Sequence, residues 1–434
     1  MSEQVSTLTA PFWTHGGLTV ADGRLQVAGR DAEAIARTHG TPLYAFDLTR
    51  AQEKAVALRD ALRRAGLDPR VRLAIKSCRE PEVLAAFRAL GPVGSPDAVG
   101  IDACSPQEVA WALAHGFAES EVSHTGTNMS DRDVAALVAH PDLRITVDLV
   151  TQVERLGRAA PGRSIGLRLN PRASASSRHE GGESPYSHSD RPTKFGILPE
   201  QLEQAVAAAH RHGMTVTVAH FHVAAFILNE QLPAFEIAVE KAAAMVARLQ
   251  ALGCPIEEVN AGGGLGVPLQ PGVTPLDLDA YAGVLARHLG PLGVAVGVEP
   301  GEFLTDEAGL MLAEVVTVEE RDGHTFAGLD AGWNVLCSPF VYGVRHEIVL
   351  THDVTGHPSE LVTVTGHINE GDDVFAEDAP LPPVAEGDVV AILGSGGYNI
   401  AMASRHCFRP LPRVVTFADR TGTDLGTATT PSWA

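Results

Sequence analysis

Short apolar segments alternate with longer amphipathic segments through the first two thirds of the chain. The apolar runs are rich in Val, Ile and Leu, and the stretches between them carry apolar residues at helical spacing. This alternation is typical of repeated strand–helix units around a parallel sheet. We predict strands at 43–46, 71–77, 100–104, 122–125, 144–147, 164–169, 215–223, 256–260 and 293–298. The predicted helices include 48–65, 106–115, 202–212, 232–252 and 278–289.

About eight such repeats predict an α/β fold, a closed (β/α)8 TIM barrel over residues 41–305. The pattern then changes to strand-like segments broken by Gly, Asp and Pro, which predicts an all-β domain over 306–434, with strands at 310–321, 347–350, 361–364, 388–393 and 413–416. Residues 1–40 are expected to pack with this β-domain. Residues 172–193, dense in Ser, Arg, His and Gly, are expected to form a mobile loop at the barrel mouth.

Composition narrows the function classes. The 434 residues include 33 Lys plus Arg and 53 Asp plus Glu, and the resulting charge of −20 disfavours nucleic acid and anionic membranes as partners. No apolar stretch reaches the roughly 20 residues of a membrane helix, and the start lacks the order of a secretory signal, so we expect a cytoplasmic protein. The five cysteines include no Cys-x-x-Cys pair, so neither a disulfide framework nor a metal site is predicted. A small-molecule partner is favoured.

Polar residues that end apolar runs are the candidates for chemistry, because barrel enzymes act at the carboxyl ends of their strands. Lys76 ends one such run. A lysine there is usually a solvated residue with its stem on apolar surface, but it is also a candidate for a Schiff base with a carbonyl. His222, Gly262–Gly264 and Glu299 end other runs, and three successive glycines suit the close approach of a phosphate. Taken alone, His222 fits a core histidine, the glycines fit a turn and Glu299 fits an ion pair. Their shared placement at the ends of apolar runs predicts a site.

Other motifs follow a fixed order along residues 41–415: Leu73–Lys76, Arg168–Pro171, Lys194–Ile197, Phe221–Val223, Gly262–Gly264, Glu299–Gly301, Asp330–Gly332, Glu370, Gly397–Tyr398, Met402–Ser404 and Arg409–Pro410. This order resembles the fold-type III pyridoxal phosphate (PLP) amino-acid decarboxylases, which include diaminopimelate and ornithine decarboxylases. The resemblance covers most of the chain. It implies an alanine racemase-like barrel with PLP as the cofactor and an amino acid as the substrate.

The resemblance also implies roles for particular residues. Lys76 would hold PLP as an aldimine, and His222 would stack on the pyridine ring. Glu299 would pair with the pyridine nitrogen and keep it protonated, so that the ring can absorb electrons. Racemases of this fold are expected to place an arginine there, so Glu299 favours decarboxylation. The phosphate would be held by Gly262, Gly263, Gly264 and Tyr398.

Departures from the family fall within the site. The family's His-x-Gly-Ser is replaced by 222–225, with Ala225 in place of the serine hydroxyl. Glu302 stands where Glu-Pro-Gly-Arg has arginine, and Ser338 replaces a second arginine in the segment that also carries Tyr342. Those arginines receive the distal carboxylate in diaminopimelate decarboxylases. We therefore predict another substrate, with a cationic or neutral far end near Glu302, Ser338 and Tyr342. Carboxynorspermidine decarboxylases similarly have Glu-Pro-Gly-Glu.

A further departure concerns the family's Cys-Glu motif, which is supplied across the interface of a head-to-tail homodimer with two shared sites. Asn369 precedes Glu370 here, and an amide cannot act as a thiol acid toward Cα. Lys76, Tyr398 or water would supply that proton, or the outcome differs from simple decarboxylation.

Three functions stay open at this point. The favoured one is PLP-dependent decarboxylation of an amino acid or an amino-acid-like metabolite. The same scaffold also supports a racemase, epimerase or lyase. A third possibility is a catalytically inactive homologue that binds a partner, which the retention of Lys76, His222, Glu299 and Tyr398 opposes.

Overall fold

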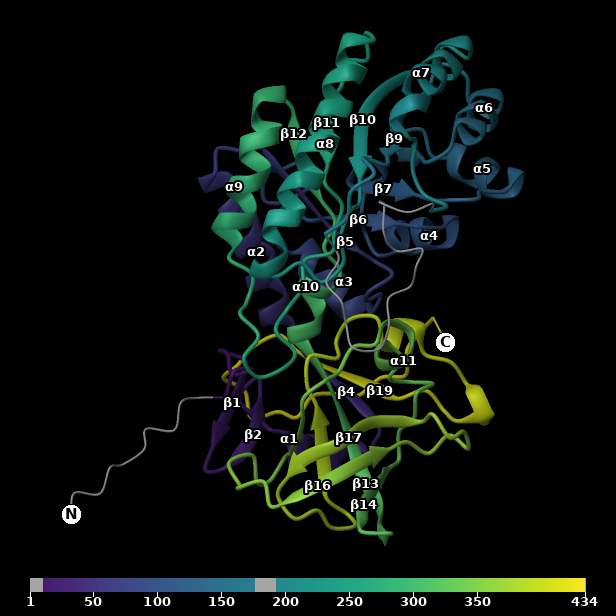
Figure 1. The fold of residues 1–434 in the computed structure, drawn as a ribbon. Helices are drawn as coiled ribbons and strands as arrows, with labels where there is room; N and C mark the ends of the chain where they lie inside the picture. Colours follow the sequence, from purple (N-terminus) through teal and green to yellow (C-terminus); the bar gives the residue numbers. More distant parts are fainter. Residues whose placement is uncertain (1–10, 176–192, 434) are drawn as a thin grey trace, which may run out of the picture.

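The computed structural model describes residues 11–175 and 193–433. It forms an α/β barrel stacked end to end on a β-domain (Figure 1). Most of the loop predicted at 172–193, namely 176–192, lies outside the described residues. Within the described residues, no helix is long and apolar enough to cross a membrane.

Eight parallel strands close the barrel, which confirms the predicted fold class. The residues of these strands are almost all buried, because helices cover the outside of the barrel and side chains fill its inside. Each predicted strand from 71–77 onward corresponds to one barrel strand. These are β5 (Pro69–Ala74), β6 (Gly100–Ala103), β7 (Val122–Thr125), β8 (Arg144–Val147), β9 (Ser164–Leu169), β10 (Thr215–Phe221), β11 (Glu258–Asn260) and β12 (Ala295–Val298).

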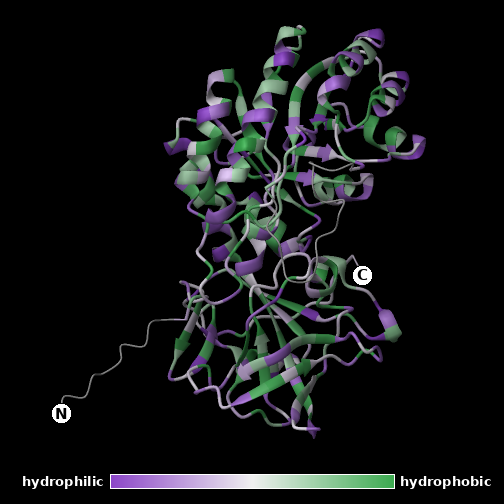
Figure 2. Cartoon of the chain, viewed as in Figure 1, coloured by the Kyte–Doolittle hydropathy of each residue, from purple (hydrophilic) through white to green (hydrophobic). Residues whose placement is uncertain are grey.

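The helices between the strands begin at residues suited to capping. The Asp47 side chain accepts the N–H of Thr49, and the Asp277 side chain accepts those of Asp279 and Ala280. Hydrophobic and hydrophilic residues alternate along these helices (Figure 2), so that one face packs on the barrel. The helices are α2 (Leu48–Arg64), α3 (Pro81–Arg88), α4 (Pro106–Ala114), α5 (Asp131–Val138), α6 (Val150–Ala159), α7 (Leu202–Arg211), α8 (Leu232–Ala251), α9 (Leu278–Leu289) and the short α10 (Glu302–Thr305).

The β-domain is built around one long strand, β13, which pairs with different neighbours along its two halves. Its strands are β4 (Leu43–Asp47), β13 (Gly309–Arg321), β14 (His324–Leu329), β15 (Ile348–Leu350), β16 (Glu360–Thr365), β17 (Val374–Leu381), β18 (Val389–Ile392) and β19 (Arg413–Phe417), and α11 (Ser338–Tyr342) lies between β14 and β15. The strands β14 and β17 were not predicted.

The strand β4 corrects the sequence prediction. It was assigned to the barrel, but it pairs with β13 and β19 in the β-domain. Both of its faces are buried, so its apolar run is indistinguishable from that of a barrel strand. We propose that the barrel begins after β4, at about residue 48, and that the β-domain includes β4 as well as 306–433.

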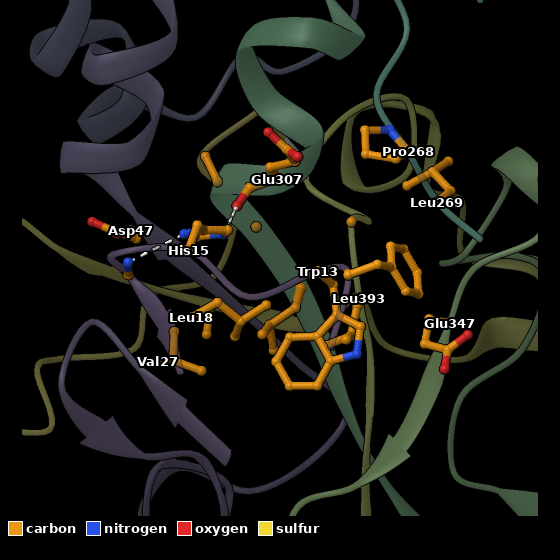
Figure 3. Close-up of a pocket in the computed structure, with 17 residues that line it drawn as sticks. Trp13, His15, Leu18, Val27, Asp47, Pro268, Leu269, Glu307, Glu347 and Leu393 are labelled. Carbon is orange, nitrogen blue, oxygen red and sulfur yellow. Dashed lines mark hydrogen bonds between the residues drawn. The ribbon is translucent and has the colours of Figure 1, made fainter. Parts of the chain in front are cut away.

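The N-terminal segment packs against the β-domain. It contains β1 (Leu18–Ala21), β2 (Arg24–Val27), β3 (Arg30–Asp31) and α1 (Ala32–His39), and its apolar side chains share a core with β4, β13 and β18. Figure 3 shows Trp13 beside Leu393 and His15 hydrogen-bonded to the Glu307 carbonyl, at 3.1 Å. The gap between these groups measures about 30 Å³, the room of one water molecule.

A buried ion pair braces the amino end of the barrel. The Arg72 guanidinium on β5 donates to both Glu258 oxygens on β11, at 2.6 and 2.9 Å, and Arg144 on β8 donates to the same carboxylate. Because β12 lies between β5 and β11, the pair crosses Gly297 of β12 on the inner side of the barrel. A Cβ at Gly297 would lie 2.5 Å from the Glu258 carboxylate, so this position requires glycine.

Removing one partner of this pair should destabilise the fold. We expect Arg72→Met to lower the free energy of unfolding by about 3–5 kcal/mol, because Glu258 is left buried with less compensation. Denaturant unfolding measures the loss. The control is Arg64→Met, which breaks an exposed pair with Asp279 and should change stability little. Equal effects of the two substitutions would contradict the bracing role.

Candidate active site

A cavity of about 420 Å³ lies at the carboxyl end of the barrel, where the barrel meets the β-domain. Most of its walls are residues that end or follow barrel strands, as the fold requires. Its described lining consists of Ala74, Lys76, Asp102, Cys104, Thr125, Gly126, Thr127, Arg168, Leu169, Asn170, Thr193, Phe195, His220, His222, Ala224, Ala225, Gly263, Gly264, Glu299 and Tyr398.

Lys76 stands two residues beyond the end of β5, with its side chain open to the cavity. Its Nζ lies 3.6 Å from the Sγ of Cys104. Burial disfavours the charged ammonium, but the acidic groups Cys104, Tyr398 and Asp102 outweigh this penalty and raise the pKa of Lys76 above its ordinary value.

Glu299 follows β12 at the centre of the strand ends. His220 lies 3.0 Å from one of its oxygens, while Asn260 and Ser123 donate to the other, Ser123 at 3.3 Å. Burial alone would raise the pKa of Glu299, but His220, Arg72 and Asn260 overcome burial and lower it to about 2. The cavity thus contains an ionised carboxylate, the partner that a protonated pyridine nitrogen requires.

Asp102 on β6 is a second buried carboxyl group beside Glu299. The Ser123 hydroxyl lies between the two side chains, 3.5 Å from Asp102 and 3.3 Å from Glu299. Burial, and then the negative charge of Glu299, raise the pKa of Asp102 well above its usual range. Two such groups cannot both ionise at close range, so Asp102 is neutral and Glu299 is charged.

His222 directly follows β10 and faces the cavity. The Gly263 N–H donates to its Nδ1 at 3.3 Å, so the ring proton is on Nε2. Burial, with the charges of Arg168 and Lys76, lowers the pKa of His222 to about 3. A neutral imidazole held in this way is suited to stack on an aromatic ring.

The glycine triplet is fixed by close backbone contacts. A Cβ at Gly263 would lie 2.2 Å from the Glu299 carbonyl, and one at Gly264, whose φ is +92°, would lie 2.2 Å from the Ala224 carbonyl. Both glycines line the cavity. Gly262 does not, and its N–H donates to Asn260 Oδ1 at 2.9 Å. Gly262 therefore shapes the turn, while Gly263 and Gly264 present the surface that a phosphate can approach.

Tyr398 brings the β-domain to the cavity. Its N–H donates to the Ser77 carbonyl at 2.9 Å, which ties the β-domain to the residue after Lys76. Its hydroxyl would lie only 2.7 Å from a Cβ at Gly301, so glycine is needed where the two units meet. The cavity is completed by both units of the chain.

The three residues predicted to meet the substrate's far end do not line this cavity. Glu302 is buried, and burial raises its pKa well above the usual range although Lys54 opposes this. The Ser338 hydroxyl is 2.7 Å from Nε2 of His346. Tyr342 lies closer to the cavity, because its ring packs edge-on against Tyr398 with centroids 5.7 Å apart.

Asn369 and Glu370 are exposed on the β-domain rather than placed in the cavity of their own chain. The Glu370 carboxylate accepts the Trp333 indole N–H at 3.1 Å and lies 2.8 Å from His406 Nε2.

The structure adds residues that the sequence analysis missed. They lie within or directly after the predicted strands: Asp102, Cys104, Ser123, Arg168, His220 and Asn260. The available signal was the same one that selected Lys76, namely a polar side chain near the end of an apolar run. Sequence spacing does not tell which side chains converge across a barrel.

Fold and cavity together define a class of protein. This class is a (β/α)8 barrel whose strand-end cavity contains a lysine, an ionised carboxylate and a glycine turn. The model of the pyridoxal-binding domain of pyridoxal-dependent decarboxylases matches residues 49–306. The chain belongs to this family, and its cofactor is PLP.

Relatives and solved structures agree with this assignment. The chain is 34% identical to a diaminopimelate decarboxylase of Methanothermobacter thermautotrophicus, over 91% of this chain and 90% of the relative. It is 31% identical to one from Streptomyces coelicolor, over 87% and 84%. The structure of diaminopimelate decarboxylase from Helicobacter pylori with L-lysine has a TM-score of 0.80 at 25% identity, covering 89% of this chain and 94% of that one. The chain is thus a PLP-dependent carboxy-lyase.

Lys76 should carry the cofactor covalently. We expect borohydride reduction of the PLP-loaded protein to leave the cofactor mass on the Lys76 peptide, and Lys76→Ala to lose both this label and the absorbance band near the visible edge. Peptide mass spectrometry and absorbance measure the two. Lys241→Ala, at an exposed position on α8, should retain both; a label on any other lysine would contradict the assignment.

Proposed function

We propose that this enzyme decarboxylates an amino acid whose far end is neutral or cationic. The observation that supports this is the loss of both arginines that the family uses for a distal carboxylate, since Glu302 and Ser338 occupy those positions. The Ser338 hydroxyl is engaged by His346, and neither Ser338 nor Glu302 is a cation that could pair with a carboxylate. A distal carboxylate would therefore lack its family clamp.

The residues of the cavity divide the work of this reaction. PLP on Lys76 would supply the electron sink for the bond between Cα and its carboxylate. Glu299 would keep the ring nitrogen protonated, because a carboxylate whose own pKa is about 2 stays ionised beside it. His222 would press on one ring face, and Gly263 and Gly264 would hold the phosphate. The β-domain, through Tyr398, would help to exclude water.

A second candidate substrate is diaminopimelate itself. The relatives that match the chain are diaminopimelate decarboxylases. The cavity also contains another cation, Arg168 on β9, whose guanidinium lies 4.2 Å from the centre of the Phe195 ring. Arg168 offers a carboxylate a different anchor from the two lost arginines, so this substrate belongs in the test.

We also propose that two copies of the chain share their sites. Large apolar side chains are exposed on the β-domain next to Glu370 and Tyr398: Phe340, Val341 and Tyr342 on α11, and Phe408, which is fully exposed. Burying them against another copy would remove apolar surface from water. Tyr342 connects this partner surface to the cavity through its contact with Tyr398.

Turnover of a substrate panel tests the specificity. We expect L-ornithine, L-lysine or L-arginine to lose the mass of CO₂ with a kcat/KM at least about 10-fold above that of meso-diaminopimelate, because unpaired buried groups penalise the wrong far end. Mass spectrometry of the products gives the rates. A preference for meso-diaminopimelate would contradict the proposal.

Mixed dimers test the shared sites. Lys76→Ala and Glu370→Gln should each abolish or strongly reduce activity alone, but mixing the two should restore activity, because one site of a mixed dimer then has both wild-type residues. The control mixes Lys76→Ala with the wild-type-like Lys241→Ala under the same conditions and measures exchange of chains. Exchange without restored activity would show that Glu370 serves its own chain.

A further inference from the structure

The cavity contains a thiol beside the catalytic lysine. Of the five cysteines, all of which lie in the described residues, Cys104 alone lines this cavity. Its Sγ is 3.6 Å from the Nζ of Lys76. Its backbone is held in place, since the Cys104 N–H donates to the Glu108 carboxylate at 2.7 Å and Ser105 caps α4. The thiol is thus a positioned group.

Decarboxylation requires a proton at Cα after CO₂ departs, and the cavity offers few donors. His222 is neutral with a pKa of about 3, and its Nδ1 already accepts the Gly263 N–H. Glu299 is ionised. Asn369 and Glu370 lie outside this chain's cavity, and the amide of Asn369 is no acid. Lys76, Tyr398, Asp102 and Cys104 remain as cavity groups that hold a proton, and of these the Cys104 thiol lies 3.6 Å from the Nζ of Lys76.

We propose that Cys104 delivers the proton that replaces the carboxylate at the substrate Cα. The substrate amine displaces Lys76, so Cα is held close to the position of Nζ and therefore close to Sγ. The bond from Cα to the carboxylate breaks and CO₂ leaves, the S–H proton passes to Cα, and the thiolate is reprotonated by the Lys76 ammonium or water. This inference rests on the decarboxylation proposed above.

Two properties of the surroundings support this role. Burial raises the pKa of Cys104 to about 12, so the thiol keeps its proton at neutral pH until a strong base forms beside it. The neighbouring Thr125 is also buried, lines the same cavity, and its Oγ1 has no hydrogen-bond partner among the described residues. An unpaired polar atom here points to a bound ligand on this wall.

Alkylation tests the placement of the thiol without turnover. We expect iodoacetamide at alkaline pH to label Cys104 of the full chain slowly, and Lys76→Ala to slow this labelling further because loss of the ammonium raises the thiol pKa. Added PLP should protect Cys104 but leave the exposed Cys407 reactive. If neither Lys76→Ala nor added PLP changes the rate of Cys104 labelling, the proposal is overturned, whatever substrate the enzyme uses.

Turnover in D₂O tests the proton transfer, on whichever amino acid the wild type decarboxylates. The wild type should place deuterium at Cα in one configuration, whereas Cys104→Ala should lower kcat about 100-fold or more, with KM and PLP affinity unchanged, and give mixed configurations. Cys104→Ser should not rescue kcat, because a hydroxyl is a much weaker acid. Cys254→Ala, a buried thiol away from the cavity, is the control. Wild-type kcat and configuration in either Cys104 variant would overturn the proposal.

Discussion

The ionised carboxylate of Glu299, buried at the carboxyl end of the barrel, is the constraint on which the site depends. A buried charge is tolerated only when several groups compensate it. Here the compensation comes from three other strands, through Ser123 on β7, His220 on β10 and Asn260 on β11. The cofactor site therefore forms only when the barrel closes correctly, because a strand out of register would remove a hydrogen-bond donor to Glu299. Burial, together with this charge, keeps the neighbouring Asp102 neutral.

The site also depends on contacts between the barrel and the β-domain. The residue after Lys76 is hydrogen-bonded to Tyr398 of the β-domain, and Gly301 leaves room for the Tyr398 hydroxyl. The lysine is thus positioned by a loop that the β-domain holds. Glu302 and Ser338, two of the departures from the family pattern, are both buried outside the described cavity lining.

Much of the fold could be predicted because strand–helix alternation is local. The helix at 278–289 was predicted to the residue, and every barrel strand was found. The errors come from tertiary context. β4 has the composition of a barrel strand since both environments bury both faces, and β14 and β17 are half-exposed strands with weaker patterns.

For the site, the sequence indicated Lys76, His222, Glu299 and Tyr398, which all line the cavity. It did not reveal the supporting set of Asp102, His220 and Asn260, because their convergence depends on barrel closure. Glu302 and Ser338 were inferred from motif position alone, and motif position does not tell which way a side chain turns.

The protonation state of the ring nitrogen in the PLP-loaded protein tests the central claim most directly. Nitrogen-15 NMR of the protein loaded with ring-labelled PLP reports it without any substrate. We expect the shift of a protonated pyridine nitrogen in the wild type and a shift toward the unprotonated form in Glu299→Gln. An unprotonated nitrogen in the wild type, or the same shift in both proteins, would contradict the account.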